Sequence, residues 1–121
     1  MSEAASASCL FCRIARGEIP SRKLFEDEDL IVFHDIHPAA PVHFLIVPKL
    51  HVDSLITAQS GHQALLGKML LLAPQLALEN GATDGFRVVI NNGRGGGQEV
   101  FHLHIHVLGG PRPWRQMSIG G

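Results

Sequence analysis

Hydrophobic and polar residues alternate along residues 100–108 of the chain, which is the period of a β-strand. From such a strand, Leu103, Ile105 and Val107 would face a hydrophobic core. Alternate residues on the opposite face lie about 7 Å apart, so three imidazoles in a row present several groups to one small ligand. These three are His102, His104 and His106.

Four further stretches are rich in strand-forming residues and predict the rest of a sheet. They are residues 23–25, 30–33, 43–47 and 85–91. The acidic residues 26–29 would join the first two as a hairpin, and short connections favour antiparallel pairing. The glycine-rich residues 92–98 lead into the histidine strand, but they lack the spacing of a dinucleotide-binding fingerprint and the lysine of a P-loop.

Helical spacing of apolar residues predicts two helices. A short one would cover residues 9–16, with Ser8 as its N-cap. A long one would run from Ser60 to about Glu79, with Ser60 and Gln63 as a capping box. The predicted fold class is therefore α+β: a sheet of about five mostly antiparallel strands with one long and one short helix.

Composition narrows the functional classes. The 121 residues predict a single domain over residues 1–121, with a loose N-terminus at 1–8 and a C-terminal tail at 111–121. A formal net charge of −1 argues against bulk binding of nucleic acid or of an anionic membrane. No apolar run reaches the roughly 18 residues that span a bilayer, and no secretory signal opens the chain. With only two cysteines, we expect a cytoplasmic protein.

Three chemistries suit a row of histidines. The imidazoles could hold a zinc ion that activates water for hydrolysis. Alternatively, one imidazole could attack phosphorus directly, because a neutral imidazole is a competent nucleophile near pH 7. Its neighbours would then donate protons and stabilise charge. In the third hypothesis the site binds a nucleotide or a metal and catalyses nothing.

The motif at residues 102–108, three histidines separated by single apolar residues, resembles the signature of the histidine triad superfamily. The match extends along most of the chain and is closest to the histidine triad nucleotide-binding proteins, which are purine nucleoside phosphoramidases. The matching segments are residues 9–14, 18–20, 33–36, 40–44, 47–49 and 97–101. The resemblance implies a homodimer in which the two sheets join into one continuous ten-stranded sheet.

It also implies hydrolysis of the P–N bond in purine nucleoside 5′-phosphoramidates, with AMP-lysine and aminoacyl adenylates among the substrates. By motif position, His104 would be the nucleophile that becomes nucleotidylated. His106 and His102 would flank the phosphate, with His106 contacting its oxygens, and His43 would support the triad. No cofactor is implied for the reaction. Diadenosine polyphosphate hydrolysis is the alternative activity, and an interaction protein without turnover is the alternative to an enzyme.

The remaining site residues also follow from the resemblance. Asp35 would bind the ribose hydroxyls, and residues 97–100 would donate backbone N–H groups to the phosphate. The implied nucleotide-binding residues are Leu10, Phe11, Ile14, Phe33, Asp35, Ile36, Asn91, Gly97, Gln98, Glu99, Val100, His104 and His106. Glu99 departs from the family pattern, in which several members carry a serine near the leaving group. A carboxylate there would repel phosphate and attract an ammonium group.

A separate metal site is a further candidate. In some bacterial relatives of the superfamily, a Cys-x-x-Cys pair and two histidines bind zinc. The corresponding residues here are Cys9, Cys12, His51 and His102. Two thiolates and two imidazoles form a chemically sound tetrahedral zinc site. Such a zinc would be structural, and catalysis would not depend on it.

Overall fold

A single five-stranded sheet forms the centre of the computed structural model, which describes residues 8–114. The strands lie in the order β1-β2-β3-β5-β4, and every neighbouring pair is antiparallel. Their bounds are β1 (Lys23–Glu26), β2 (Leu30–His34), β3 (Val42–Pro48), β4 (Phe86–Val89) and β5 (Ile105–Gly109). The predicted α+β class and antiparallel sheet are confirmed. Apart from Ser8 and residues 111–114, the predicted loose N-terminus and C-terminal tail lie outside the described residues.

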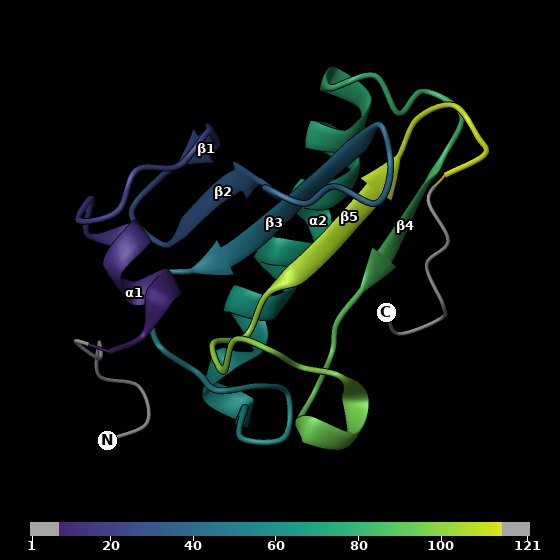
Figure 1. Cartoon of the computed structure of the whole chain (residues 1–121). Coiled ribbons are helices and arrows are strands. Elements are labelled where there is room, and N and C mark those ends of the chain that lie inside the picture. The colour runs from purple at the N-terminus through teal and green to yellow at the C-terminus, as the bar shows by residue number, and fades with distance from the viewer. Residues whose placement is uncertain (1–7, 115–121) are drawn as a thin grey trace.

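The long helix α2 (Gln63–Glu79) covers one face of this sheet (Figure 1). Because side chains alternate along a strand, every second strand residue packs against it. The resulting core is built from Leu30, Val32, Phe44, Ile46, Met69, Leu72, Ala73, Leu76, Ala77, Ala82, Ile105 and Val107. No helix within residues 8–114 is both long enough and apolar enough to cross a bilayer.

The opposite face is covered only in part, by the short helix α1 (Leu10–Ala15). Phe11 and Ile14 from α1 pack on Ile31, Phe33, Leu45 and Val47 of the sheet. His43 and His106 alternate with core residues of β3 and β5, so they share this second face. The part of the face that α1 leaves uncovered is where polar side chains meet.

Both helices begin differently from the prediction. The cap of α1 is Cys9 rather than Ser8, because the Cys9 Sγ accepts the backbone N–H of Cys12. A 3₁₀ turn, η1 (Ser60–His62), precedes α2, and its capping box is formed by Gln59 and His62 rather than by Ser60 and Gln63. The His62 ring accepts the backbone N–H of the cap residue Gln59, a role that the prediction gave to the Gln63 side chain.

The histidine strand is shorter than predicted. The sequence pattern placed residues 100–108 in one strand, whereas β5 begins at Ile105. Its partner β3 ends at Pro48, which has no backbone N–H to continue the ladder. Leu103 instead donates its backbone N–H to the carbonyl oxygen of Val52, at 2.7 Å. His102 and His104 therefore lie outside regular strand geometry, and their rings do not share one strand face.

Candidate active site

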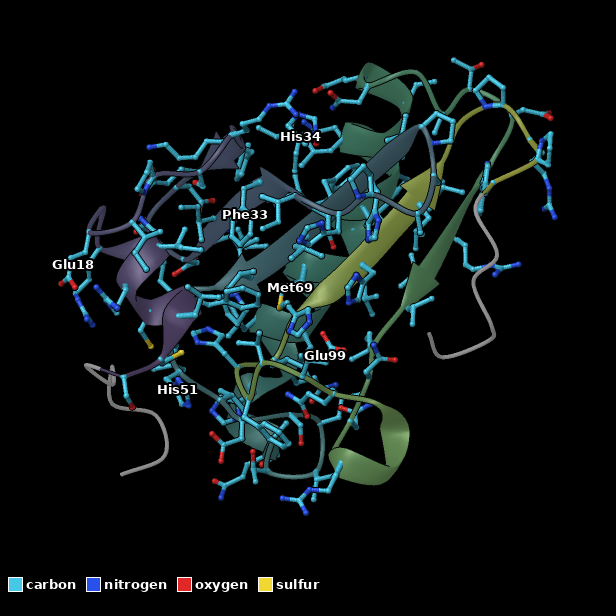
Figure 2. The ribbon with its side chains drawn as sticks, in the orientation of Figure 1. Glu18, Phe33, His34, His51, Met69 and Glu99 are labelled. Atoms are coloured by element: carbon cyan, nitrogen blue, oxygen red, sulfur yellow. The ribbon has the colours of Figure 1, made fainter. Side chains whose placement is uncertain are left out.

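A cavity of about 430 Å³ opens on the sheet face that α1 only partly covers. Its walls come from α1, the end of β2, the loop before β5 and β5 itself. Figure 2 labels Phe33, on the β2 wall, and Glu99, on the loop wall. The structure brings together nearly all the predicted nucleotide-binding residues here: Leu10, Phe11, Ile14, Phe33, Asp35, Ile36, Asn91, Gly97, Glu99, Val100, His104 and His106. Gln98 is the exception.

Sequence reasoning missed several residues of the same wall. The segment of Ile19, Pro20, Ser21 and Arg22 lines the cavity, as do His34 and Leu45. Ile19 and Pro20 lay inside a matching segment and could have been included. Arg22 carried no signal, because its position depends on how the chain leads into β1, where its carbonyl oxygen accepts the His34 N–H.

His104 is the buried imidazole of the cavity, 6% exposed. Its Nδ1 lies 2.7 Å from the carbonyl oxygen of His102. A carbonyl oxygen only accepts, so Nδ1 carries the proton and Nε2 keeps a free lone pair. Burial lowers the pKa of His104, although the bond to the His102 carbonyl and the Asp35 carboxylate oppose that shift. The ring lies edge-on to Phe11 with centroids 5.0 Å apart. It is therefore neutral at neutral pH, and the lone pair on Nε2 is chemically able to attack an electrophile.

His106 is oriented by a chain of hydrogen bonds. The Ala39 N–H donates to His43 Nδ1 at 3.0 Å, so the proton of the neutral His43 ring is on Nε2. That Nε2 lies 3.0 Å from His106 Nδ1 and donates to it. His106 consequently carries its own proton on Nε2. His43 thus lies in hydrogen-bond contact with His106, whose Nε2–H remains available as a donor.

Asp35 lies beside this chain. One carboxylate oxygen accepts the backbone N–H of His37 at 2.8 Å, and the other is 3.4 Å from His43 Nε2 and 4.0 Å from His106 Nδ1. The pKa of His106 is nevertheless lowered to about 4, because burial disfavours the imidazolium and His104 and His43 repel it, against the attraction of Asp35. In the free protein His106 is neutral.

The ring of His102 does not reach the cavity. It is fully buried, and Nε2–H donates to the Pro48 carbonyl oxygen at 2.7 Å. Its Nδ1 faces the sulfur atoms of Cys9 and Cys12, at 3.2 and 3.6 Å. The expectation that His102 flanks the phosphate does not fit this placement. The residue instead contributes its carbonyl oxygen, which fixes the tautomer of His104.

His51 completes a second cluster with His102 and the two cysteines, as the sulfur atoms near His51 indicate (Figure 2). Its Nδ1 is 3.3 Å from the Cys12 Sγ, and its Nε2 lies 2.8 Å from an Asp53 carboxylate oxygen. The four candidate metal-ligand atoms all lie within 4.8 Å of one another. Zinc ligands 2.0–2.3 Å from the metal in a tetrahedron are about 3.3–3.8 Å apart, so the donor set fits zinc.

Gln98 holds the loop that forms one wall of the cavity. Its side chain is buried, accepts the Gly93 N–H at 2.8 Å and donates to the carbonyl oxygens of Asp53 and Val100 at 2.7 and 2.9 Å. Within residues 8–114, the backbone N–H groups of Glu99 and Val100 donate to no protein acceptor. Two residues of this wall therefore retain backbone donors for an anion.

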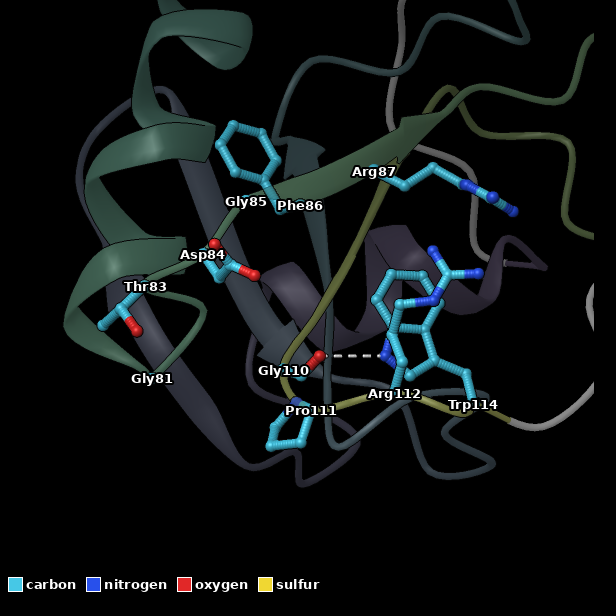
Figure 3. A pocket seen from close by; sticks show the side chains of 10 residues that line it. All are labelled: Gly81, Thr83, Asp84, Gly85, Phe86, Arg87, Gly110, Pro111, Arg112 and Trp114. Atoms are coloured by element: carbon cyan, nitrogen blue, oxygen red, sulfur yellow. Dashed lines mark hydrogen bonds between the residues drawn. The ribbon is translucent and has the colours of Figure 1, made fainter.

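A second cavity, of about 450 Å³, lies at the other end of β5 (Figure 3). The Trp114 indole donates to the Gly110 carbonyl oxygen at 3.0 Å, and the guanidinium carbons of Arg87 and Arg112 lie 5.7 and 5.2 Å from the indole centroid. Among residues 8–114, no histidine or cysteine lines this cavity. Its main groups are therefore an indole and two guanidinium groups, neither of which is a nucleophile. The imidazoles that could react with a ligand line the first cavity.

Comparison with known proteins agrees with this geometry. The family model for the HIT domain matches residues 16–112. The chain belongs to the HIT, or histidine triad, family. This confirms the superfamily predicted from the motif at residues 102–108.

Individual HIT proteins match over most of their length. The chain is 56% identical over 104 residues to protein HitA of Neisseria gonorrhoeae, covering 86% of this chain and 97% of that protein. It is 45% identical to a HIT family hydrolase of Legionella pneumophila, with a TM-score of 0.84 and coverage of 87% and 95%. A histidine triad protein of Clostridium difficile gives 42% identity and a TM-score of 0.85, with coverage of 91% and 96%. The chain thus has the fold of HIT family hydrolases.

Proposed function

We propose that this HIT protein hydrolyses the P–N bond of purine nucleoside 5′-phosphoramidates through a nucleotidylated His104. The observation that carries the proposal is the hydrogen bond from His104 Nδ1–H to the His102 carbonyl oxygen, 2.7 Å long, which leaves Nε2 unprotonated in a cavity. A nucleophile whose tautomer is fixed before substrate binds needs no proton removed in order to attack.

In the first step, the His104 Nε2 forms a bond to phosphorus, and the P–N bond to the leaving amine breaks. The electron pair of that bond passes to the amine nitrogen, which takes a proton from a His106 imidazolium. His106 is neutral in the free protein, but an anionic phosphoryl group beside it raises its pKa and stabilises the charged form. The neighbouring Asp35 carboxylate acts in the same direction.

In the second step, water adds to phosphorus and the bond to His104 breaks. One proton of the water returns to His106, which restores the imidazolium, and the nucleoside monophosphate leaves. The sum of the two steps is phosphoramidate plus water giving monophosphate plus amine. Unpaired backbone N–H groups at Glu99 and Val100 support charge on the non-bridging oxygens.

The apolar wall supports a purine nucleoside as the bound group. Phe11 and Phe33 form an edge-to-face pair with centroids 5.5 Å apart, and the exposed side chain of Ile36 lines the cavity near them. A flat heterocycle gains from burial between such groups. Asp35, on the same wall, supplies carboxylate oxygens for ribose hydroxyls.

The test is release of AMP from adenosine 5′-phosphoramidate. We expect His104→Ala to lose turnover by at least about a thousandfold while still binding AMP in calorimetry. His37→Ala is the matched control, because the His37 side chain is exposed and its contact with Asp35 uses the backbone N–H. Trapping AMP on His104 by quenched-flow mass spectrometry would support the covalent step.

Each of three results would contradict the proposed function. Full turnover by a folded His104→Ala protein would show that His104 is not the nucleophile. Faster turnover of diadenosine polyphosphates than of the phosphoramidate would favour that alternative substrate class. Binding of AMP without release from either substrate would indicate an interaction protein. We also expect activity to persist in EDTA, since no step above requires a metal.

We infer in addition that the cluster of Cys9, Cys12, His51 and His102 binds a structural zinc ion. The two imidazoles already present Nδ1 to the thiols, and the Pro48 carbonyl and the Asp53 carboxylate fix both rings from behind. Bound zinc would tie the start of α1 to the segment that precedes β5. Metal analysis of purified protein, with one zinc per chain expected, tests this inference.

A homodimer is the assembly that we propose for this chain. β4 is an edge strand, and Phe86 and Val88 on it are each 38% exposed. Leu71 and Leu78 of α2 are 77% and 61% exposed. An apolar edge beside an apolar helix surface is suited to sheet extension by a second copy. Light scattering should show a dimer that Val88→Lys weakens and Val88→Thr preserves.

A further inference from the structure

The cavity contains one carboxylate that the structure does not use. Its lining includes two carboxylates, those of Asp35 and Glu99. Asp35 is held by the His37 N–H and lies against His43. Glu99 is exposed to the cavity and makes no hydrogen bond or ion pair within residues 8–114. Its charge is therefore free to act on a ligand.

The backbone around Glu99 is fixed even though its side chain is not. Gln98, immediately before it, is anchored by three hydrogen bonds of 2.7–2.9 Å. One of those bonds reaches the carbonyl oxygen of Val100, immediately after it. Gly97 turns the chain into this position with a φ of 83°, in the left-handed region that favours glycine. The backbone of Glu99 is thus held on the wall shared with His104, and its carboxylate moves only within the reach of one side chain from that point.

The negative charge of the Glu99 carboxylate excludes the phosphate of a substrate as its binding partner. A carboxylate repels a phosphoryl group, so Glu99 can serve the phosphate only through its backbone N–H. The purine and ribose carry no positive charge for it to bind. Of the parts of a phosphoramidate, the leaving amine is the one that can carry a cation.

We propose that Glu99 is a specificity-determining residue that binds a positive charge on the leaving group. Beyond the lysine conjugate that the family resemblance already implies, the preferred substrates are then nucleoside phosphoramidates of diamines, whose second nitrogen is cationic. This inference rests on the proposed P–N hydrolysis and names its substrate class. The chemical steps are unchanged, because the second nitrogen stays protonated throughout and takes no part in bond making.

The test compares two adenosine 5′-phosphoramidates of equal chain length, one of pentylamine and one of 1,5-diaminopentane. The readout is the ratio of their kcat/KM values, in which any general loss of activity cancels. Because the carboxylate is solvent-exposed, we expect the wild-type ratio to favour the diamine by about 3- to 10-fold. Glu99→Gln should bring the ratio to about one, and Glu99→Lys should invert it.

Glu28→Gln is the matched control, since Glu28 is an exposed carboxylate in the turn between β1 and β2 and does not line the cavity. It should retain the wild-type ratio, and added salt should reduce that ratio in both proteins. Turnover of both substrates with the same ratio in wild type and Glu99→Gln overturns the role of Glu99 alone. Release of AMP from neither substrate by the wild-type protein overturns the proposed hydrolysis as well.

Discussion

Replacing Gln98 by alanine tests whether one buried amide supports the wall of the active site. The side chain is 6% exposed and makes three hydrogen bonds, all to backbone groups. The substitution leaves the Gly93 N–H and the carbonyl oxygens of Asp53 and Val100 without this partner. Because these groups belong to the loop between β4 and β5 and to the segment that follows β3, the loop should lose both stability and shape.

The magnitude follows from the number of bonds. A hydrogen bond within a protein contributes about 0.5–1.5 kcal/mol net to stability. Three bonds give about 1.5–4.5 kcal/mol, so we expect the free energy of unfolding to fall by about 3 kcal/mol. For a chain of this size, a urea m-value of about 1.5 kcal/mol/M converts that loss into a midpoint lower by roughly 2 M.

Urea denaturation and steady-state kinetics measure the two effects. Gln75→Ala is the matched control, because Gln75 is exposed on α2 and its replacement should change stability little. We expect kcat/KM for adenosine 5′-phosphoramidate to fall by about 10- to 100-fold in Gln98→Ala, since displacement of a positioning wall costs that much.

Two results would refute this reasoning. A loss of stability below about 0.5 kcal/mol, similar to that of Gln75→Ala, would show that water replaces the amide without cost. A large loss of stability with unchanged kcat/KM would show that residues 97–100 do not need Gln98 to form the wall.

Three further predictions address the histidines, the thiols and the apolar wall. The pKa of His106 is about 4 in the fold and about 6.5 when unfolded, so its contribution to stability is fully present above pH 6.5 and is lost as the pH falls towards 4. Over this range wild type should lose about 3 kcal/mol more stability than His106→Phe, because His102, whose pKa is also lowered to about 4, contributes the same loss to both proteins. Cys12→Ser should reduce the zinc content of the purified protein and lower its melting temperature, whereas Thr83→Ala, at an exposed position outside the cluster, should do neither. Ile36→Ala should weaken AMP binding by about 3- to 10-fold in calorimetry with little change in stability, because Ile36 is 84% exposed in the free protein.

The alternation of histidines correctly predicted that His104 and His106 line one cavity, but it misplaced His102. The period of a strand holds only while a neighbouring strand pairs with it, and the pairing of β3 with β5 stops at Ile46 and Ile105. Continued in the same register, β3 would bring Pro48, which has no backbone N–H, opposite Leu103. No pattern within residues 100–108 contains that information, since it depends on a residue more than fifty positions earlier. The fold and the cavity lining could be predicted, whereas the direction of the His102 ring could not.

Local signals were also ambiguous where several polar residues compete for one cap. Ser60 is a common N-cap residue, yet the structure uses Gln59 and His62. Gln98 differs from its prediction in another way. The family resemblance implied that its backbone N–H binds phosphate, whereas this N–H donates to the Gly93 carbonyl oxygen and the side chain is turned inward. A sequence reports which side chains have the right chemistry, and packing decides which of them face solvent.

The cavity is assembled from residues near positions 10, 35 and 100, which meet only when the sheet and α1 are in place. An unfolded chain therefore has no site, and any molecule that occupies the cavity favours folding. At a hundred times its dissociation constant, such a molecule adds about 2.7 kcal/mol, or a rise of several degrees in melting temperature. Ranking nucleosides, nucleotides and amine conjugates by that rise would identify the preferred occupant without assuming any reaction.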